Sequence, residues 1–490
     1  MKKRRNHADS SVWMALPLYI FTIVFVVCPL IYMVALSFAT PSRGFGVTWK
    51  FTLDNYKNIL EPVYLNTFVE SLKLALTSTV VIALIGYPFG YFMARLPEHR
   101  KKKAQLLLST PFWVNSLIRL YGWIIILQKK GLLNFILLKL GIIEKPLSIL
   151  YSYPAIVIGM IYVLLPFMIM SVYSSAEKLD WSYVEAARDL GASRMQAFFS
   201  ITLKLTLPGL LSGVILTFVP SMGLFFIADI LGGNKVVLVG SLIQDLQKSD
   251  QCKRTGGNRM KKNSKFAGFY MGLIFFLMYL PIAVVIVFSF NESKLPVKFT
   301  GFSLKWYQEL IHDREMLEAL VNSLILGVLS CLVSAVIGTL GAVGLSRIHW
   351  KSKGALEYIS ILPLMIPEII LGMVLMAFFY MLNLPFGMLT LLIGHTVFCV
   401  PYILMEVKAR LAGMDPALVI SGSLLAFAMS MDDVVISIFV NGPRLSTLPI
   451  KVYTQLKTGV TPEINALCTI LLAATLVIFI VYSLITKKKK

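Results

Sequence analysis

The sequence predicts an all-α integral membrane protein that crosses the bilayer about eleven times. Of its 490 residues, 57% are hydrophobic and 14% are charged, whereas a soluble protein carries about 25% charged residues. The apolar residues stand in long runs, and most runs reach the ~20 residues that a helix needs to cross a bilayer. Basic residues gather in short segments between these runs, such as Arg100 to Lys103, which is typical of cytoplasmic loops in a multi-pass plasma-membrane protein.

The net charge of +21 would suggest nucleic-acid binding in a soluble chain. Here the excess lies beside or between apolar runs, at Lys2 to Arg5, at Lys261-Lys262 and at Lys487 to Lys490. We therefore expect contact with membrane lipid and no nucleic-acid partner. The apolar run that ends at Phe38 is too long for a signal peptide, so we expect a retained first span.

Five candidate spans lie in the first half of the chain and six in the second. The short apolar run Leu132–Ile143 is expected at the membrane interface, and the basic segment 251–265 is expected to link the halves in the cytoplasm. The candidate spans are Val12–Phe38, Phe68–Leu96, Ala104–Leu127, Tyr153–Tyr173, Pro208–Leu231, Phe266–Phe290, Leu320–Ile348, Tyr358–Leu382, Met388–Val407, Ser421–Val440 and Ile464–Ile485.

The two halves repeat in the same direction. Ser71-Leu72 recurs as Ser323-Leu324, and Ser221-Met222 recurs as Ser430-Met431. Parallel repeats predict two similar domains around an axis normal to the membrane. The spacing between the copies shortens along the chain, because the second half lacks residues that the first half has between Asp180 and Ser212.

An odd number of crossings conflicts with the basic chain ends and the basic linker, which should share the cytoplasmic side. The first half has no counterpart of the span Ile464–Ile485, and Val236–Leu246 is too short to cross as a helix. Either one span is missing from this chain or a segment re-enters the membrane.

The polar loop 180–208 between two spans carries the most informative motif. It contains Glu185, Ala186, Ala187, Arg188, Asp189 and, after Leu190, Gly191. Small residues let a short helix pack closely, Gly191 permits a sharp exit turn, and the charged residues can fix its register on a partner. An ordinary amphipathic loop helix is the alternative.

This motif resembles the EAA loop of binding-protein-dependent ABC importer permeases, with two departures. Lys204 stands where that family has a proline, and in the second half Met414-Asp415-Pro416 runs directly into the next span. The resemblance implies that the loop forms a short cytoplasmic helix that docks on an ATPase subunit. It also implies two such loops, whereas this chain has one.

The resemblance extends over nearly the whole chain. The stretch Pro111 to Arg119 looks like the B-type permease subunit of the spermidine/putrescine ABC importer, and the stretch Ser430 to Val435 looks like its C-type subunit. This implies two tandem type I (MetI-like) permease domains: residues 1–250, which hold the EAA loop 180–208 and lack a last span, and residues 266–490, which lack an EAA loop.

Acidic side chains inside spans are costly and default to a functional role. Asp432, Asp433 and Glu368 lie within second-half spans, and Asp229 ends a first-half span. Such acids could pair with the ammonium groups of a polyamine, while aromatic side chains cover its methylenes. We therefore expect a substrate path that includes Ser430 and the aromatic candidates Trp113, Tyr121, Trp123, Phe379 and Tyr380.

Each of these residues also has a plainer interpretation. Asp432 and Asp433 could serve helix packing or pair with Arg119, and Trp113 could belong to an interfacial aromatic belt. Tyr56 and Trp306 are expected in loops at the outer face, where they would dock a delivery protein or anchor the chain. His395 is expected to be a helix–helix hydrogen-bonder.

The expected partners are ABC ATPase subunits, as a dimer, and an extracytoplasmic polyamine-binding protein. The chain has no GxxxxGK[ST] motif, so ATP hydrolysis is expected on the partner and not here. No metal or cofactor is expected, since the five cysteines lack metal-ligand spacing. The alternatives are an importer permease for iron, sulfate or an amino acid, an ion-coupled secondary transporter, and a non-functional remnant.

Overall fold

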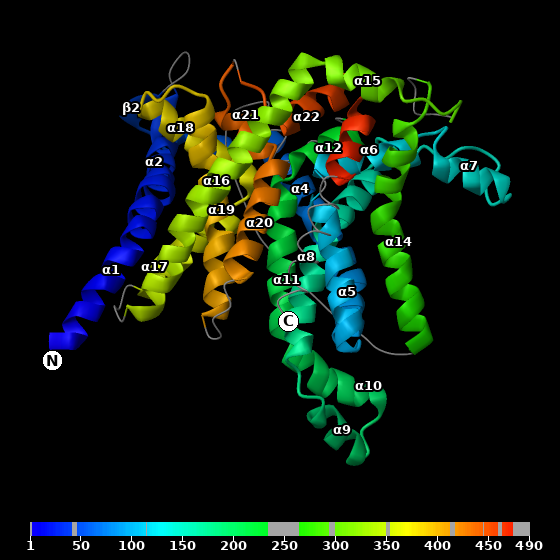
Figure 1. Ribbon diagram of the computed structural model, residues 1–490, viewed down its shortest axis with the longest axis horizontal. Helices are drawn as coiled ribbons and strands as arrows, with labels where there is room; N and C mark the ends of the chain where they lie inside the picture. The colour runs from blue at the N-terminus through cyan, green and yellow to red at the C-terminus, as the bar shows by residue number, and fades with distance from the viewer. Residues whose placement is uncertain are drawn as a thin grey trace. The chain divides into compact units, whose positions relative to one another are not determined.

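The computed structural model describes residues 2–41, 47–113, 115–233, 264–293, 299–348, 353–411, 417–443, 445–458 and 463–473, which are almost entirely helical (Figure 1). Within these ranges eight helices are long and apolar enough to cross a membrane. The bent pair Lys353–Met365 and Glu368–Met381 brings the number to nine. The prediction of an all-α membrane protein is therefore confirmed.

The helices form two compact units that do not follow the order of the sequence. Unit 1 combines Met1–Asn66 with Asp313–Gln455, and unit 2 combines Thr67–His312 with Leu456–Lys490. The predicted sequence domains 1–250 and 266–490 therefore differ from the compact units, because each half of the sequence gives its first span to the unit formed mainly by the other half.

Unit 1 begins with a long first span and a small hairpin. These are α1 (Lys2–Thr22), η1 (Ile23–Val27), α2 (Cys28–Ser37), β1 (Ala39–Pro41), β2 (Val47–Phe51) and α3 (Asp54–Asn58). The remaining helices are α16 (Arg314–Arg347), α17 (Lys353–Met365), α18 (Glu368–Met381), α19 (Met388–Arg410), α20 (Ala417–Asp432), α21 (Val435–Val440) and α22 (Leu448–Thr458), whose last residues belong to unit 2.

Two glycines bring the first span of unit 1 into close contact with α16. A Cβ built on Gly341 would lie 2.5 Å from Leu18, and one built on Gly344 would lie 2.6 Å from Ala15. Leu18 belongs to the buried cluster of this unit, together with residues of α19 such as Ile403. The backbones approach so closely only because both glycines lack a side chain.

Unit 2 is built around α4 (Pro62–Ala94), α8 (Tyr153–Glu177) and α11 (Leu203–Gly223). The other elements are α5 (Glu98–Ser109), η2 (Thr110–Trp113), α6 (Ser116–Leu127), α7 (Leu132–Lys139), α9 (Ser182–Asp189), α10 (Arg194–Ala197), η3 (Phe198–Thr202), α12 (Phe225–Gly232), α14 (Ser264–Ser289), α15 (Lys305–His312) and the helix Glu463–Ala473. The hydroxyl of Tyr162 in α8 donates to the carbonyl of Met278 in α14 at 3.0 Å, which ties α14 into this unit.

The internal sequence repeat corresponds to a set of side-chain contacts that occurs in both units. In unit 1, Phe38 stacks on Phe51 with ring centroids 5.6 Å apart and also meets Tyr56 at 5.4 Å. The hydroxyls of Tyr56 and Ser37 are 2.8 Å apart. Unit 2 repeats this arrangement with Phe290, Phe302, Tyr307 and Ser289. In both units these side chains fix the end of the first span to the segment that follows it.

Most predicted spans have a helical counterpart, and the differences are instructive. Ser421–Val440 is not one helix, because α20 ends at Asp432 and α21 starts at Val435. Of Ile464–Ile485, only the part within Glu463–Ala473 is described. The question of a missing or re-entrant span falls on residues 234–263, which lie outside the described ranges. The described elements on either side of them, α12 and the start of α14, lie at opposite ends of unit 2 (Figure 1).

Candidate functional site

Two broken helices in unit 1 place three carboxylates inside its apolar bundle. α17 and α18 meet at an angle of 106°, and Glu368 is the first residue of α18, directly after Pro367. Asp432 ends α20, and Asp433 lies in the break before α21. Breaks of this kind expose backbone groups within a membrane protein only where protein or a polar path surrounds them.

Asp433 holds the start of α21 in place. Its Oδ1 accepts from the backbone N–H of Ile436 at 3.2 Å, and its Oδ2 accepts from the backbone N–H of Ser437 at 2.9 Å. The Ser437 hydroxyl donates to the same oxygen at 3.1 Å. Asp433 is 6% exposed, so this carboxylate supplies the partners that the first turn of a helix lacks.

A chain of hydrogen bonds connects Asp433 with α19 and α16. Ser330 Oγ donates to Ser430 Oγ at 3.0 Å, and Ser430 Oγ lies 2.7 Å from His395 Nδ1. His395 Nε2 lies 2.9 Å from Ser437 Oγ and 3.3 Å from Asp433 Oδ2. Because Ser437 donates to Asp433, its oxygen accepts from His395, which places a proton on Nε2.

Glu368 and Asp432 complete the acidic cluster. Glu368 interacts electrostatically with both Asp432 and Asp433. Glu368 and Asp432 are each partly exposed, whereas Asp433 is buried. Asp432 also ends α20, where the helix dipole is negative. The combined charge at this point of unit 1 favours a cation.

Of the other predicted path residues, Ser430 joins the acidic cluster through His395. Tyr380 is 54% exposed and lies twelve positions after Glu368 in α18, about 18 Å along the helix. Asp229 lies in unit 2, where its carboxylate pairs with Lys457 at 2.7 Å. Trp113 ends η2 of unit 2, and its side chain lies outside the described part of the structure.

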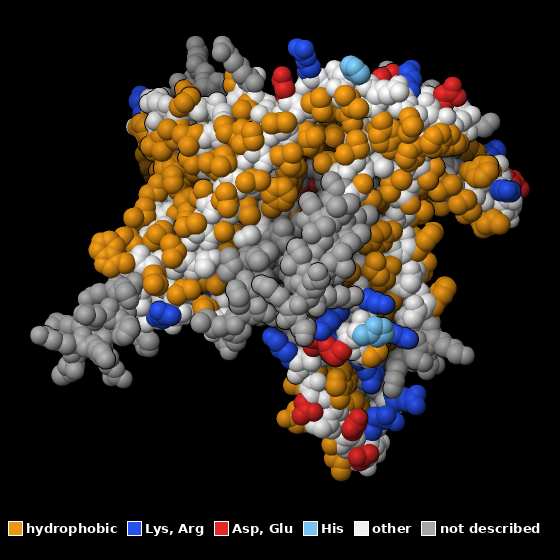
Figure 2. Space-filling model, viewed as in Figure 1, with side chains coloured by type: hydrophobic (Ala, Val, Ile, Leu, Met, Phe, Trp, Pro, Cys, Tyr) orange, Lys and Arg blue, Asp and Glu red, His pale blue; other side chains and the backbone are white. Residues whose placement is uncertain are grey.

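The predicted coupling motif forms the short helix α9, which projects beyond the spans α8 and α11 (Figure 1). The projection carries acidic and basic side chains together with hydrophobic ones (Figure 2). The residues Glu185, Ala186, Arg188 and Asp189 are exposed, and Ala187 is half-buried.

Local geometry fixes where α9 starts and ends. The backbone N–H of Ser182 donates to Asp180 Oδ1 at 3.0 Å, and this bond keeps the pKa of the Asp180 carboxyl below its usual value. Gly191 has φ +87°, and a Cβ there would meet nothing within 4 Å. Glycine is therefore favoured at this position by its backbone conformation and not by lack of space.

Among the described residues of the second half, no helix corresponds to α9. There α20 begins at Ala417, only seven residues after α19 ends at Arg410, whereas α8 and α11 of unit 2 enclose α9, α10 and η3. Residues 412–416 lie outside the described part of the structure.

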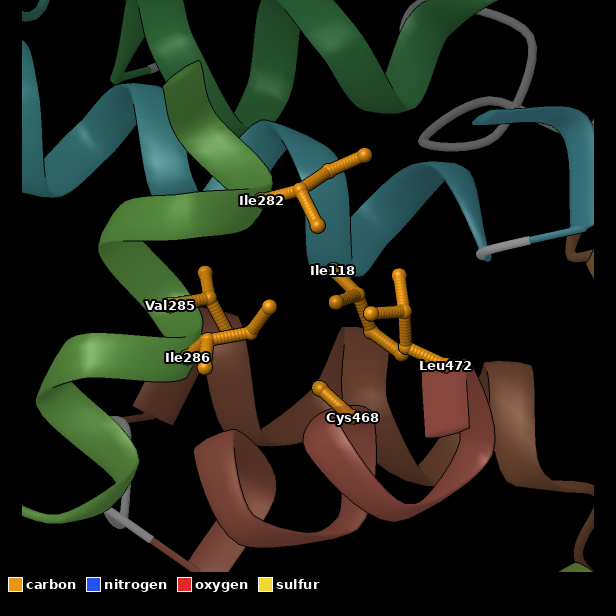
Figure 3. Close-up of a pocket in the computed structure, with 6 residues that line it drawn as sticks. All are labelled: Ile118, Ile282, Val285, Ile286, Cys468 and Leu472. Carbon is orange, nitrogen blue, oxygen red and sulfur yellow. The ribbon is translucent and has the colours of Figure 1, made fainter. Parts of the chain in front are cut away.

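Unit 2 contains a small pocket (Figure 3). Side chains of α6, α14 and the helix Glu463–Ala473 face it: Ile118, Ile282, Val285, Ile286, Cys468 and Leu472. Its cavity volume is about 10 Å³, hardly room for one water molecule. An apolar space of this size cannot hold a charged cargo.

The structure corrects one expectation and confirms another. Of the two roles expected for Trp306, docking is wrong and anchoring remains, because it is 4% exposed and its Nε1 donates to the carbonyl of Asn291 at 2.6 Å. His395 does join helices by hydrogen bonds, as its type and position indicated. The roles of Ser330 and Ser437 were not predicted, although Ser437 stands four residues after Asp433, the spacing of one helical turn.

Comparison with known proteins agrees with the helical membrane architecture. Residues 86–251 match the family described as binding-protein-dependent transport system inner membrane component. The chain is 46% identical over 222 residues to the spermidine/putrescine transport system permease protein PotB of Escherichia coli (strain K12), covering 45% of this chain and 81% of that protein. The identity to PotB of Salmonella typhi is also 46%, with 77% of that protein covered.

A second type of relative matches as well. The chain is 36% identical over 249 residues to the spermidine/putrescine transport system permease protein PotC of Escherichia coli (strain K12), covering 45% of this chain and 94% of that protein. Each type covers less than half of this chain and most of its own length, as a tandem of two permease halves requires. The chain therefore belongs to the family of binding-protein-dependent transport system inner membrane components.

Proposed function

We propose that this chain is the transmembrane permease of an ATP-driven importer that carries polyamines into the cytoplasm by alternating access. The observation that carries the proposal is the acidic cluster of Glu368, Asp432 and Asp433 at the helix breaks of unit 1. The names of the PotB and PotC relatives, which specify spermidine and putrescine, support the same cargo.

The three carboxylates would have different roles in transport. Glu368 and Asp432 are partly exposed and would pair with ammonium groups of the cargo. One such pair at 4 Å is worth about 4 kcal/mol at an effective dielectric constant of 20. Asp433 is buried and occupied by α21 and His395, so it would position the break without binding cargo directly.

The coupling side of the proposal rests on α9. Its exposed residues Glu185, Arg188 and Asp189 would fix its register on an ABC ATPase subunit. ATP binding and hydrolysis on that partner, a dimer, would move α9 and reverse the exposure of the path. An extracytoplasmic polyamine-binding protein would deliver the cargo at the opposite face of the membrane.

Uptake of radiolabelled spermidine by cells that express this chain with its ATPase tests the proposal. Asp432→Asn and Glu368→Gln should each lower uptake strongly, by about tenfold or more for the loss of one close charge pair. Glu318→Gln, which neutralises an exposed carboxylate of α16 in the same unit, should leave uptake unchanged. Equal uptake in all three variants would refute the assignment of these acids.

Two rival functions make different predictions in the same cells. If the cargo were an anion or an amino acid, excess unlabelled spermidine would not inhibit the uptake of that cargo. An ion-coupled transporter would take up cargo without the ATPase subunit, and its uptake would collapse with the proton gradient. Co-purification of an ATPase subunit with the chain would favour the proposed importer over the second rival.

A further inference from the structure

The coupling loop of unit 2 rests at both of its ends on the last turns of α4. Trp181 directly precedes α9, and Phe198 follows α10. The ring of Tyr91 in α4 meets both edge-on, with centroids 5.7 Å from Trp181 and 6.1 Å from Phe198. Tyr91 and Phe198 are buried, whereas Leu190 between the two contacts is 89% exposed. The loop is therefore anchored at both ends, with Leu190 exposed between the two contacts.

Arg95, the residue after α4, closes the contact with the entry to α9. Its guanidinium carbon lies 4.7 Å from the ring centre of Trp181 and 5.7 Å from that of Tyr91. Nη1 also donates to the Tyr91 hydroxyl at 3.3 Å, and the carboxylate of Glu185 in α9 attracts the guanidinium. An arginine over a tryptophan face is among the more favourable cation–π pairs.

The chain itself does not join α4 to the coupling loop. α8 leads into the loop and α11 leads out of it, so both helices follow its displacement through covalent connection. α4 can follow only through non-covalent contacts. These are the contacts of Arg95 and Tyr91 with the loop, the 2.8 Å hydrogen bond between Tyr87 and Thr206 of α11, and the packing of α4 against α8 at Gly90 and against α11 at Ala75. With 33 residues, α4 is about 50 Å long and extends across a bilayer.

We propose that Arg95 is a positioning residue that clasps the coupling helix α9 to α4 through Trp181. A displacement of α9 by a partner ATPase is then passed to α4 together with α8 and α11, and the three helices move as one body. The transmission role rests on the proposed function, whereas the clasp itself is a property of this chain alone.

Amide hydrogen exchange of residues 182–197 in the full-length purified chain tests the clasp without any transport. Arg95→Ala should speed exchange there about fivefold, because a cation–π pair that tethers the loop is lost. Arg95→Lys, which keeps a cation over the ring, and Arg100→Ala, which removes an exposed arginine of α5, should exchange like the wild type. Unchanged exchange in Arg95→Ala would overturn the clasp. Trp181→Phe, with a weaker aromatic partner, provides an intermediate variant should Arg95→Ala fail to fold.

Vesicles that contain the chain with its ATPase test the transmission role. The amount of spermidine imported per ATP hydrolysed should fall about fivefold in Arg95→Ala, the size expected for losing one coupling contact, and should be kept in Arg95→Lys and Arg100→Ala. Faster exchange with an unchanged ratio would overturn the transmission role. A wild-type chain that imports no spermidine would refute the proposed function, and hydrogen exchange would still decide whether the clasp exists.

Discussion

Asp433 accepts hydrogen bonds from two backbone N–H groups of α21, whereas its neighbour Asp432 ends α20 and is partly exposed. The two carboxylates are adjacent in the chain, but the break in the helix turns them into different surroundings. A carboxylate that is fully engaged in capping has little left to offer a passing cation. A carboxylate at the negative end of a helix dipole gains by pairing with one.

Neutralising each carboxylate in turn should separate these roles. Asp433→Asn keeps the size of the side chain but weakens the cap of α21, and it should lower the free energy of unfolding by about 1–2 kcal/mol. Asp432→Asn should leave the free energy of unfolding within about 0.5 kcal/mol of the wild type, while uptake falls. Thermal unfolding in detergent, followed by tryptophan fluorescence, measures the free energy of unfolding of both variants. An equal loss of stability in the two variants would contradict the division of roles.

We expect His395 to stabilise unit 1 through the hydrogen bonds of its two ring nitrogens. His395→Leu would remove one hydrogen-bond partner from each of the Ser430 and Ser437 hydroxyls inside the bundle, at a cost of about 1–3 kcal/mol. His395→Gln offers a donor and an acceptor at similar reach and should retain more of the stability. The same unfolding measurement applies, and a leucine variant as stable as the glutamine variant would show that the hydrogen-bond chain contributes nothing.

The residue scale also shows where sequence reasoning stops. Charged side chains in apolar runs are conspicuous, so Asp432, Asp433 and Glu368 could be selected from the sequence alone. Which of Asp432 and Asp433 is buried depends on where the helix breaks between α20 and α21, and nothing in the apolar run 421–440 predicts that break. Trp306 illustrates the same limit, because its burial follows from a hydrogen bond to Asn291, fifteen residues earlier.

At the scale of elements, the helices that were hardest to predict are the ones that are broken. Uninterrupted spans such as α8 and α14 follow directly from hydropathy. The bend between α17 and α18 lies at Pro367, which could be anticipated from the missing backbone donor. The break between α20 and α21 has no proline or glycine and is held by the contacts of Asp433 and His395.

The exit turn of α9 gives a prediction at this scale. Gly191 has φ +87° with open space around it, so Gly191→Ala strains only the backbone, by about 1–2 kcal/mol. The variant should keep its fold but retain less ATPase subunit on purification and import less spermidine. Gly191→Asn should be milder, since asparagine tolerates the left-handed region better.

Gly141 supplies a matched control for that variant. It also has positive φ, +68°, and open space around it, and it lies in the loop after α7, outside the coupling loop. Gly141→Ala should strain the backbone similarly without affecting ATPase retention. Equal losses in the two variants would mean that general destabilisation, and not the shape of the coupling loop, explains the effect.

At the scale of the whole molecule, each compact unit draws on both halves of the chain. Unit 1 needs residues up to Asn66 as well as Asp313–Gln455, and unit 2 needs residues up to His312 together with those from Leu456 onward. The repeat in the sequence predicts two similar domains, but it does not reveal this exchange of first spans. The exchange depends on the close contact that Gly341 and Gly344 allow with Leu18 and Ala15, which appears in no local pattern.

This exchange predicts how the chain behaves when it is cut within the linker 251–265. Neither half alone contains a complete unit, so each expressed by itself should lose stability and be degraded. Co-expressed halves should reassemble, because each supplies the first span against which the other packs, and a tag on one half should recover the other from detergent extracts.

Gly344→Val in the second half should weaken that recovery, since a Cβ there would already lie 2.6 Å from Ala15. Gly354→Val, at a position with open space, should not weaken it. Halves that fold and unfold cooperatively in isolation would contradict the interdependence of the two units.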